Sequence, residues 1–280
     1  MCKFDPARHD QPRSGLQLRG KTILVTRART QSEDITTRLE ALGASVIHFP
    51  TIEFAPPDDW APLDHALDRI DEYDWLVFTS ANGASFFFGR LRELRLLKVI
   101  HPLAGCVICA VGPATARAIE AAGEVVSVVA YDSKAEGALT AIIQYAGGEE
   151  NVRKLRFLIP RARVAREALP DGLRRLGAHV ETVEAYQTVK PVLDRDLVTK
   201  LFKENSMSAI TFTSSSTVSN FAELAGLTDL SGLLANVLVA CIGPTTAETA
   251  AKHGLTQIIQ PEQYNAPALV ESIVKSIGEK

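Results

Sequence analysis

The sequence contains one long unit twice, and this repeat limits the folds that the chain can adopt. Residues 21–43, which include Arg27, match residues 155–177, which include Arg161. A period of this length is too large for a solenoid repeat, so it predicts two domain-sized halves that arose by duplication. Further matches are Phe-Thr-Ser at 78–80 and 212–214, at the same spacing, and Gly-Pro at 112–113 and 243–244, at a spacing shorter by three residues.

The predicted strands and helices alternate along both halves. Short apolar runs rich in β-branched residues predict strands, and segments with apolar residues at helical spacing predict helices. This alternation favours two similar α/β domains with doubly wound parallel sheets, flavodoxin-like or Rossmann-like, covered by helices on both faces. The expected strands are 22–26, 75–79, 106–111, 125–129, 157–160, 209–213, 237–242 and 257–259. The expected helices include 31–42, 60–70, 83–96, 113–122 and 136–145.

Two extended segments occupy equivalent positions in the repeat. Residues 44–57 and 178–191 alternate polar and apolar side chains over much of their length and end at prolines, which cannot continue a strand ladder. We interpret them as candidate interdomain linkers. Between the first strand and the first of these segments, Thr30 to Glu33 has the spacing of a helix capping box, and Gly43 has the place of a left-handed helix stop.

Composition narrows the range of partners. The 280 residues are 46% hydrophobic and 22% charged, which is typical of a soluble protein of about two domains. A net charge of -3 gives no overall reason to bind nucleic acid. No apolar run approaches the ~20 residues that span a bilayer. Residues 1–20 lack the apolar centre of a secretory signal, so we expect a cytoplasmic protein without a membrane partner. We interpret residues 1–20 as a flexible lead-in. A transit peptide is the alternative, but the acidic residues Asp5 and Asp10 argue against it.

The repeated Gly-Pro pairs predict anion-binding sites. Proline at the first helical position gives up an amide that has no partner there, and the following amides stay free to bind carboxylate or phosphate. Taken singly, each pair is better explained as an ordinary helix start. Their repetition, together with Thr115 and the Thr245-Thr246 pair, makes anion binding an equally good explanation. The candidate residues at these turns are Gly112, Thr115, Gly243, Thr245 and Thr246.

Other candidate residues lie where predicted strands end. Ser80, Ser214 and Ser216 offer hydroxyl groups there, although plain helix N-caps would also explain them. Arg27 and Arg161 follow equivalent strands, and two such strand-end rims facing each other would make a cleft. No dinucleotide or phosphate-loop motif is present, and the histidines show no metal-binding spacing. The Cys-x-x-Cys at 106–109 lies in a predicted strand, where residues three apart point to opposite faces, so we interpret it as structural.

The ordered set of motifs resembles the uroporphyrinogen-III synthase family. The motifs are Thr-Arg-Ala-Arg at 26–29, Phe-Thr-Ser at 78–80, Ala-Val-Gly-Pro-Ala-Thr-Ala at 110–116, Glu-Ala-Tyr-Gln-Thr at 184–188, Thr-Phe-Thr-Ser-Ser-Ser-Thr-Val at 211–218 and Ile-Gly-Pro-Thr-Thr-Ala at 242–247. The resemblance runs from Leu18 to the C-terminus. It implies two α/β domains joined by a two-stranded linker, so that one domain is discontinuous.

This resemblance implies definite boundaries. A flexible lead-in covers 1–20, domain 1 comprises 21–47 plus 193–280, domain 2 comprises 58–178, and the β linker comprises 48–57 and 179–192. A simple tandem division near Glu150 is the competing layout.

The family also implies a reaction. Its members cyclise the linear tetrapyrrole hydroxymethylbilane to uroporphyrinogen III with loss of water and inversion of the last ring, using no metal and no cofactor. Tyr186 matches the family tyrosine proposed to assist departure of the hydroxyl group, although an aromatic residue that only packs the linker is the alternative. Asn82 stands where some relatives have arginine, which leaves a polar contact but puts a charged clamp in doubt. We expect a monomer that binds this polycarboxylate.

A different class of function remains open from the residues alone. A non-catalytic tetrapyrrole-binding or anion-binding regulatory module, or a two-domain solute-binding protein, would share this outline. The retained Tyr186 and both Gly-Pro turns favour an enzyme.

Overall fold

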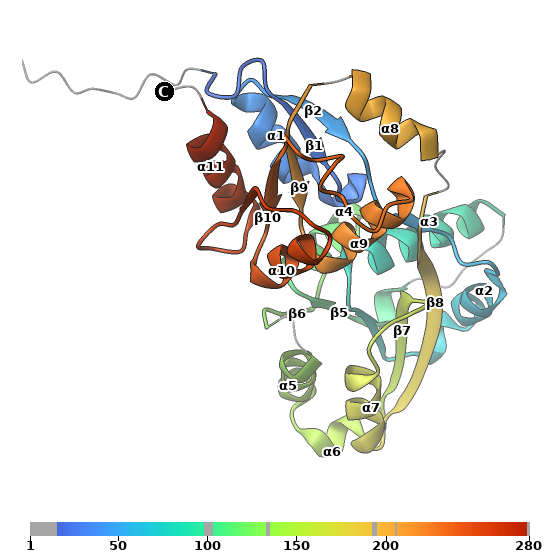
Figure 1. Ribbon diagram of the computed structural model, residues 1–280. Helices are drawn as coiled ribbons and strands as arrows, with labels where there is room; N and C mark the ends of the chain where they lie inside the picture. The colour runs from blue at the N-terminus through green and yellow to red at the C-terminus, as the bar shows by residue number, and fades with distance from the viewer. Residues whose placement is uncertain (1–15, 98–102, 133–134, 192–194, 205, 279–280) are drawn as a thin grey trace, which may run out of the picture. The chain divides into compact units, whose positions relative to one another are not determined.

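The computed structural model describes residues 16–97, 103–132, 135–191, 195–204 and 206–278. It is an α/β protein with two parallel-stranded sheets, shown in Figure 1. The chain divides into two compact units. Unit 1 comprises Met1–Glu53 and Lys190–Lys280, and unit 2 comprises Phe54–Val189.

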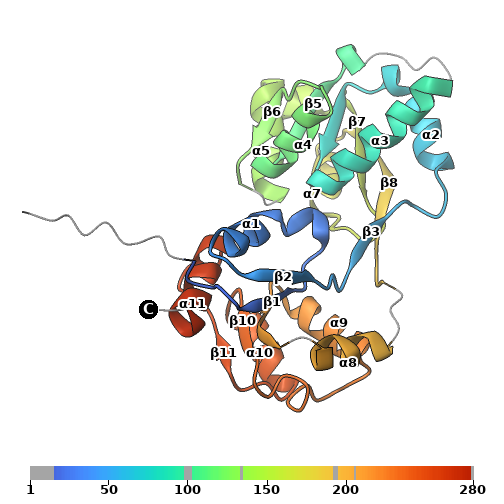
Figure 2. The ribbon, with the colours of Figure 1, turned by 90° about the horizontal axis from the view of Figure 1, so that it is seen from above.

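The sheet of unit 1 has the strand order β11-β10-β9-β1-β2, and every neighbouring pair is parallel. Helices α1 and α11 cover one face of this sheet, while α8, α9 and α10 cover the other, as Figure 2 shows. The strands are β1 (Thr22–Val25), β2 (Ser45–His48), β9 (Met207–Phe212), β10 (Leu238–Cys241) and β11 (Ile258–Ile259); the helices are α1 (Glu33–Ala41), α8 (Arg195–Glu204), α9 (Ser215–Ala225), α10 (Pro244–Lys252) and α11 (Ala266–Ile277).

The sheet of unit 2 has the order β3-β8-β7-β4-β5-β6. Helices α2, α3 and α4 pack on one face, and α5, α6 and α7 pack on the other. The strands are β3 (Glu53–Ala55), β4 (Trp75–Phe78), β5 (Val107–Val111), β6 (Val128–Ala130), β7 (Arg156–Ala162) and β8 (His179–Val189); the helices are α2 (Ala61–Asp68), α3 (Ala81–Leu97), α4 (Pro113–Ala121), α5 (Ala135–Ala146), α6 (Glu149–Val152) and α7 (Ala168–Arg175).

Strand alternation builds the core on both faces of each sheet. In β4, Leu76 and Phe78 pack under α2 to α4, whereas Trp75 and Val77 pack under α5 to α7. Successive side chains of a strand point to opposite faces, and a sheet covered on both faces buries all of them. This explains why the predicted strands read as continuous apolar runs, and the parallel α/β fold predicted from them is confirmed.

The two cysteines of the Cys-x-x-Cys motif follow the same rule. Cys109 lies in the core under α5 to α7, whereas Cys106 packs against the core of the opposite face, so their predicted separation is confirmed. Burial raises the pKa of the Cys109 thiol to about 12. Cys106 donates a hydrogen bond to the carbonyl oxygen of Tyr73 at 3.2 Å.

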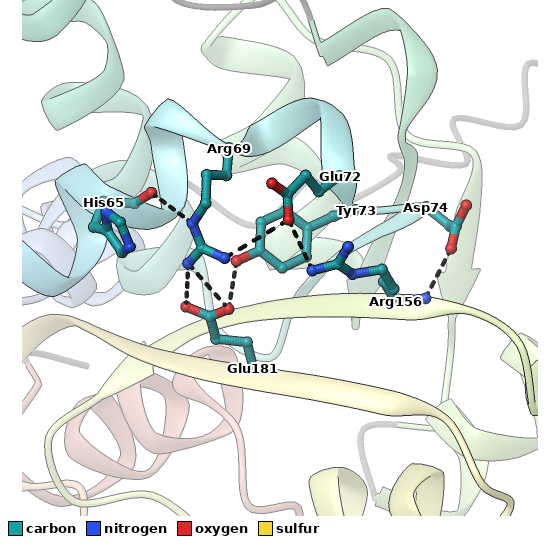
Figure 3. A network of polar contacts seen from close by, with 7 residues as sticks. All are labelled: His65, Arg69, Glu72, Tyr73, Asp74, Arg156 and Glu181. Atoms are coloured by element: carbon teal, nitrogen blue, oxygen red, sulfur yellow. Dashed lines mark hydrogen bonds and ion pairs between the residues drawn. The ribbon is translucent and has the colours of Figure 1, made fainter.

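A polar network ties together the amino-terminal ends of β4, β7 and β8, as Figure 3 shows. The Tyr73 hydroxyl donates a hydrogen bond of 2.5 Å to Glu181, whose carboxylate also accepts from Arg69 at 3.3 Å. Arg156 donates to Glu72 at 2.8 Å. Burial, reinforced by the Glu181 carboxylate, raises the pKa of Tyr73 above its ordinary value.

The start of α1 differs from its prediction. The capping box predicted at Thr30 to Glu33 is wrong, because Arg29–Gln31 forms a 3-10 turn and Ser32 precedes the helix. The Ser32 hydroxyl donates to the Arg29 carbonyl at 3.0 Å instead of accepting from a helix amide. The predicted stop at Gly43 is confirmed by its positive φ of 85°.

Two further segments differ from a simple lead-in and linker. Residues 1–15 of the predicted lead-in lie outside the described residues, but Leu18 is fully buried and its amide donates to the Leu42 carbonyl at 2.8 Å. Leu18 therefore belongs to the folded part of unit 1. Strand β8, in the second extended segment, pairs in parallel with the whole of β7, from His179 to Tyr186.

Candidate active site

A pocket of about 520 Å³ opens at the carboxyl ends of the unit 2 strands. Strands β7 and β5 lie on opposite sides of β4, so the chain direction across the sheet reverses there. Ligands of open parallel sheets bind at such a reversal. The lining residues come from β4, β5, β7, β8, α5, α7 and their connections: Thr79, Ser80, Val111, Ala135, Glu136, Ala138, Ile159, Arg161, Ala162, Val164, Ala165, Arg166, Ala168, Leu169, Pro170 and Tyr186.

Tyr186 is held on three sides. Its ring stacks on Phe86 with centroids 5.6 Å apart and meets Phe54 edge to face, which leaves the side chain 7% exposed. The phenol oxygen lies 3.1 Å from Ser80 Oγ, and Ser80 Oγ accepts a hydrogen bond from the Gly83 amide at 3.0 Å. Tyr186 therefore packs as an aromatic residue while its hydroxyl group lies at the pocket.

A register shift in β8 helps to place Tyr186. The pairing with β7 shifts between Arg161 and Ala162, so that Arg161 faces Glu184 and Ala162 faces Tyr186. As a result Ala185 and Tyr186 both pack on the core under α2 to α4, which neighbours in a regular strand do not do. Such bulges commonly redirect a side chain beside an active site.

Arg161 has an incompletely satisfied guanidinium group. Its Nη2 is paired with the Glu167 carboxylate, and its side chain is 17% exposed. Its Nη1 is buried and has no hydrogen-bond partner in the part of the chain that the structure describes. A buried charged donor without a partner is costly. The pocket therefore contains a cation with unused capacity for an anion.

The first Gly-Pro turn has the backbone that the sequence predicts but a different use for its threonine. Gly112 has φ 86° and ψ 155°, a conformation that only glycine adopts readily. The Thr115 hydroxyl donates to the Val111 carbonyl at 2.8 Å and is buried, so it serves the turn. The amides of the first turn of α4 lack helical acceptors by position.

The predicted site residues of unit 1 that correspond to Ser80 and Arg161 lie at the carboxyl ends of the strands in the unit 1 sheet. Ser214 is the N-cap of α9, with its Oγ accepting from the Thr217 amide at 3.2 Å in a capping box. Ser216 Oγ lies 2.9 Å from Ser214 Oγ. Arg27 donates to the Gln31 side chain at 3.2 Å, and burial lowers the pKa of its guanidinium.

The second Gly-Pro turn differs from the first in its backbone. Gly243 is extended, with φ -173°, so the turn itself does not need glycine; an added Cβ would instead lie 3.3 Å from the Tyr264 ring. Thr245 is exposed at the start of α10, and Thr246 is buried.

The structure brings only part of the predicted set into one pocket. Ser80, Arg161 and Tyr186 line it together, whereas Asn82, Gly112 and Thr115 belong to unit 2 but are not among its lining residues. Sequence reasoning missed Glu167, the partner of Arg161. Its place just before the helix that follows β7 marks it as a residue near the strand ends, but it does not predict the pairing with Arg161.

Two classes of site find no support in the described residues. Among them, no group of three histidine, cysteine, aspartate or glutamate side chains is placed to hold a metal ion. None of the helices in the described ranges is long and apolar enough to span a membrane.

The fold and the pocket define an α/β protein with hydroxyl, phenol and guanidinium groups around a crevice at the strand ends. The model of the family described as uroporphyrinogen-III synthase HemD matches residues 33–271. The chain therefore belongs to the uroporphyrinogen-III synthase family.

Individual relatives agree along nearly the whole chain. The uroporphyrinogen-III synthase of Synechococcus elongatus is 33% identical over 91% of this chain and 94% of its own length. That of Chlorobaculum parvum is 29% identical over 92% and 99%. Among solved structures, uroporphyrinogen-III synthetase from Helicobacter pylori has a TM-score of 0.56 at 17% identity, covering 91% of this chain and 99% of its own, which supports the fold.

Proposed function

We propose that this chain is a uroporphyrinogen-III synthase, a cyclising lyase that converts hydroxymethylbilane to uroporphyrinogen III in heme biosynthesis. The observation that carries the proposal is the family match over residues 33–271. The pocket at the reversal point of the unit 2 sheet supports it, because a phenol, a hydroxyl group and a partly unpaired guanidinium meet there.

Tyr186 is the proposed proton donor. The reaction begins when the substrate loses its terminal hydroxyl group, and a proton from the phenol turns that group into water. Because Ser80 Oγ accepts the Gly83 amide hydrogen, the hydroxyl hydrogen of Ser80 is available to the Tyr186 oxygen. That arrangement leaves the Tyr186 hydrogen for the substrate and stabilises the phenolate that forms. The phenolate then recovers a proton from the cyclised intermediate.

The remaining chemistry depends on how the substrate is held. The cation formed by loss of water is attacked by the substituted carbon of the terminal ring, and the spiro intermediate breaks and recloses with that ring inverted. Favouring this closure about 100-fold over direct closure needs roughly 2.7 kcal/mol of differential transition-state binding. Fixing a flexible substrate in one conformation supplies energies of this size, so the reaction needs no cofactor.

The substrate's carboxylates are the proposed partners of the strand-end residues. Charge-assisted hydrogen bonds from guanidinium groups and helix amides suit them. The proposed substrate-binding residues are Arg27, Ser80, Asn82, Gly112, Thr115, Arg161, Ser214, Ser216, Gly243, Thr245 and Thr246.

The proposed layout is a duplicated α/β domain with interleaved halves, linked by two β segments, in a cytoplasmic monomer. The strand orders support duplication: read from β11 and from β6, both sheets run through equivalent elements of the repeat, β10 matching β5, β9 matching β4 and β1 matching β7. Each sheet takes strands from both halves of the sequence, and unit 1 is built from two separate stretches of chain. These features favour the interleaved layout over a tandem division near Glu150.

The isomer assay tests the activity. The protein is incubated with freshly prepared hydroxymethylbilane, the products are oxidised to porphyrins, and the type I and type III isomers are separated. We expect type III to predominate over the type I product that forms spontaneously. A product ratio equal to that of the buffer control would show that the chain lacks this activity, as the alternative of a non-catalytic binding module expects.

A further inference from the structure

The unit 2 pocket has the size and lining of a site for one ring of a larger ligand. Its volume of about 520 Å³ lies in the lower half of the range for small-molecule pockets, ~300 to 1,000 Å³. Ile159, Leu169 and Ala138 form an apolar wall, and the polar groups of Ser80 and Tyr186 lie at the strand ends. An apolar wall beside a few polar groups suits a flat heteroaromatic ring that carries acid chains.

Arg161 indicates what the ring must carry. A guanidinium presents parallel N–H groups that match both oxygens of a carboxylate. Glu167 reaches only Nη2, while the buried Nη1 has no partner among the described residues. The other oxygen of Glu167 lies 3.8 Å from Arg174 Nη1. The observed pair thus leaves half of the guanidinium unused.

Glu167 is placed so that another carboxylate can replace it. It precedes α7 as the N-cap residue but makes no capping hydrogen bond with its side chain, which is 48% exposed. Arg174 lies within reach to accept it as an alternative ion-pair partner. Glu167 can therefore leave Arg161 without breaking a helix-capping hydrogen bond, and it still has Arg174 as a cationic partner.

The mouth of the pocket carries an apolar side chain that a ring would cover. Val164, in the connection between β7 and α7, lines the pocket and is 89% exposed. A ring bound in the pocket would cover part of this side chain and so remove apolar surface from water.

We infer that this pocket binds one acid-bearing pyrrole ring of the substrate, and that Glu167 is an internal counter-ion which the ring's carboxylate replaces on Arg161. This inference rests on the proposed function and goes beyond it in assigning the pocket, its ring and the exchange of counter-ions. Glu167 then sets the affinity of the resting pocket by competing with the ligand.

The first experiment compares steady-state kinetics for Arg161→Met, Glu167→Gln and the matched control Arg163→Met in the full chain. Arg163 lies two residues from Arg161 but pairs with Glu184 and Asp58. We expect Arg161→Met to raise KM for hydroxymethylbilane about tenfold or more with a much smaller change in kcat, since it removes a charge-assisted contact. Glu167→Gln alone should lower KM several-fold. When it is added to Arg161→Met, it should cause no further change in KM. Arg163→Met should behave as the wild type.

The second experiment uses porphobilinogen, a single pyrrole with one acetate and one propionate, as an inhibitor of turnover. Porphobilinogen should inhibit Glu167→Gln more strongly than the wild type, and Arg161→Met more weakly. The dimethyl ester of porphobilinogen should not inhibit the wild type or either variant. If the wild type forms type III product but Arg161→Met keeps its KM, the pocket assignment is wrong. If Glu167→Gln raises KM as Arg161→Met does, Glu167 orients Arg161 and does not compete. A wild type that forms no type III product overturns the proposed function, and the substrate assigned to the pocket with it.

Discussion

Ser80 Oγ lies 3.1 Å from the phenol oxygen of Tyr186, joining the end of β4 to the far part of β8. Ser80 Oγ also accepts a hydrogen bond from the Gly83 amide, and both Ser80 and Tyr186 line the pocket. A phenol with one fixed partner and one free direction is well placed to donate a proton.

Tyr186→Phe should lower kcat for the type III isomer about 100-fold or more, the usual loss when a positioned proton donor is removed. The ring remains to pack on Phe86, so the unfolding temperature should change little. Tyr145→Phe is the control, because that exposed tyrosine packs against Trp75 away from the pocket. If Tyr186→Phe turns over as the wild type does, the acid role is wrong.

Gly83→Ala should disturb the Ser80 and Tyr186 contact from within α3. The added Cβ would lie 3.1 Å from Ser80 Oγ and 3.3 Å from the Pro160 carbonyl oxygen, too close for either to remain in place. We expect a destabilisation of about 1–3 kcal/mol together with a lower kcat. Chemical denaturation and the isomer assay measure the two effects.

Gly89→Ala provides the matched control in the same helix. Its Cβ would meet nothing within 4 Å, so the substitution should stabilise the protein by about 0.5–1 kcal/mol through helix propensity. Equal effects of the two substitutions would show that the tight contact at Gly83 has no role in placing Ser80.

The alkaline stability of the protein should depend on Tyr73. Its pKa is raised in the folded state, so it stays protonated where the unfolded tyrosine, with an ordinary pKa near 10, already ionises. The folded state then binds more protons than the unfolded state, and stability falls as the pH rises above about 10. The contribution is fully present below that pH.

Tyr73→Phe should remove this dependence. At neutral pH it should cost about 1.5–3 kcal/mol by deleting the hydrogen bond to the Glu181 carboxylate, and the difference from the wild type should shrink above pH 10. Denaturant midpoints measured from pH 7 to 11 give both quantities, with the exposed Tyr131→Phe as the control. A constant difference across that range would contradict the assignment.

The two Gly-Pro turns should respond differently to alanine. Gly112→Ala forces a positive φ on a residue with a side chain and should cost about 1–3 kcal/mol. Gly243→Ala keeps an extended backbone and has only to displace the ring of the exposed Tyr264, so its cost should be less than about 1 kcal/mol. Thermal unfolding of the two variants makes the comparison, and equal losses would contradict it.

This contrast shows what the sequence can and cannot predict. Apolar periodicity identified the strands because both faces of each sheet are buried, and that environment forces continuous apolar runs. The turns at Gly112 and Gly243 share the Gly-Pro pair, yet their backbone angles differ. The Gly112 amide donates to the Ala130 carbonyl oxygen, whereas Gly243 lies against the ring of Tyr264. Contacts across the sheet decide such details, and no local pattern encodes them.

The site was predictable to the same extent. Strand ends located Ser80 and Arg161 from sequence, because parallel strands end on one edge. The pairing of Arg161 with Glu167 depends on how α7 returns to the sheet, and the position of Tyr186 depends on a register shift in β8. Neither follows from residue type or spacing, so the pocket emerged only from the three-dimensional fold.

The proposed interleaved layout predicts how fragments of the chain should fold. A chain of residues 54–189 contains β4 to β8 and the helices on both faces of that sheet, so it should fold alone and unfold cooperatively. Residues 21–150, the first half of a tandem division, contain β4 to β6 without β7 and β8, which would leave β4 unpaired on one side and much of the core under α5 exposed. Circular dichroism, denaturant titration and limited proteolysis of both fragments measure their folding. A stable fragment 21–150 beside an unfolded 54–189 would show that the two halves of the repeat fold in tandem.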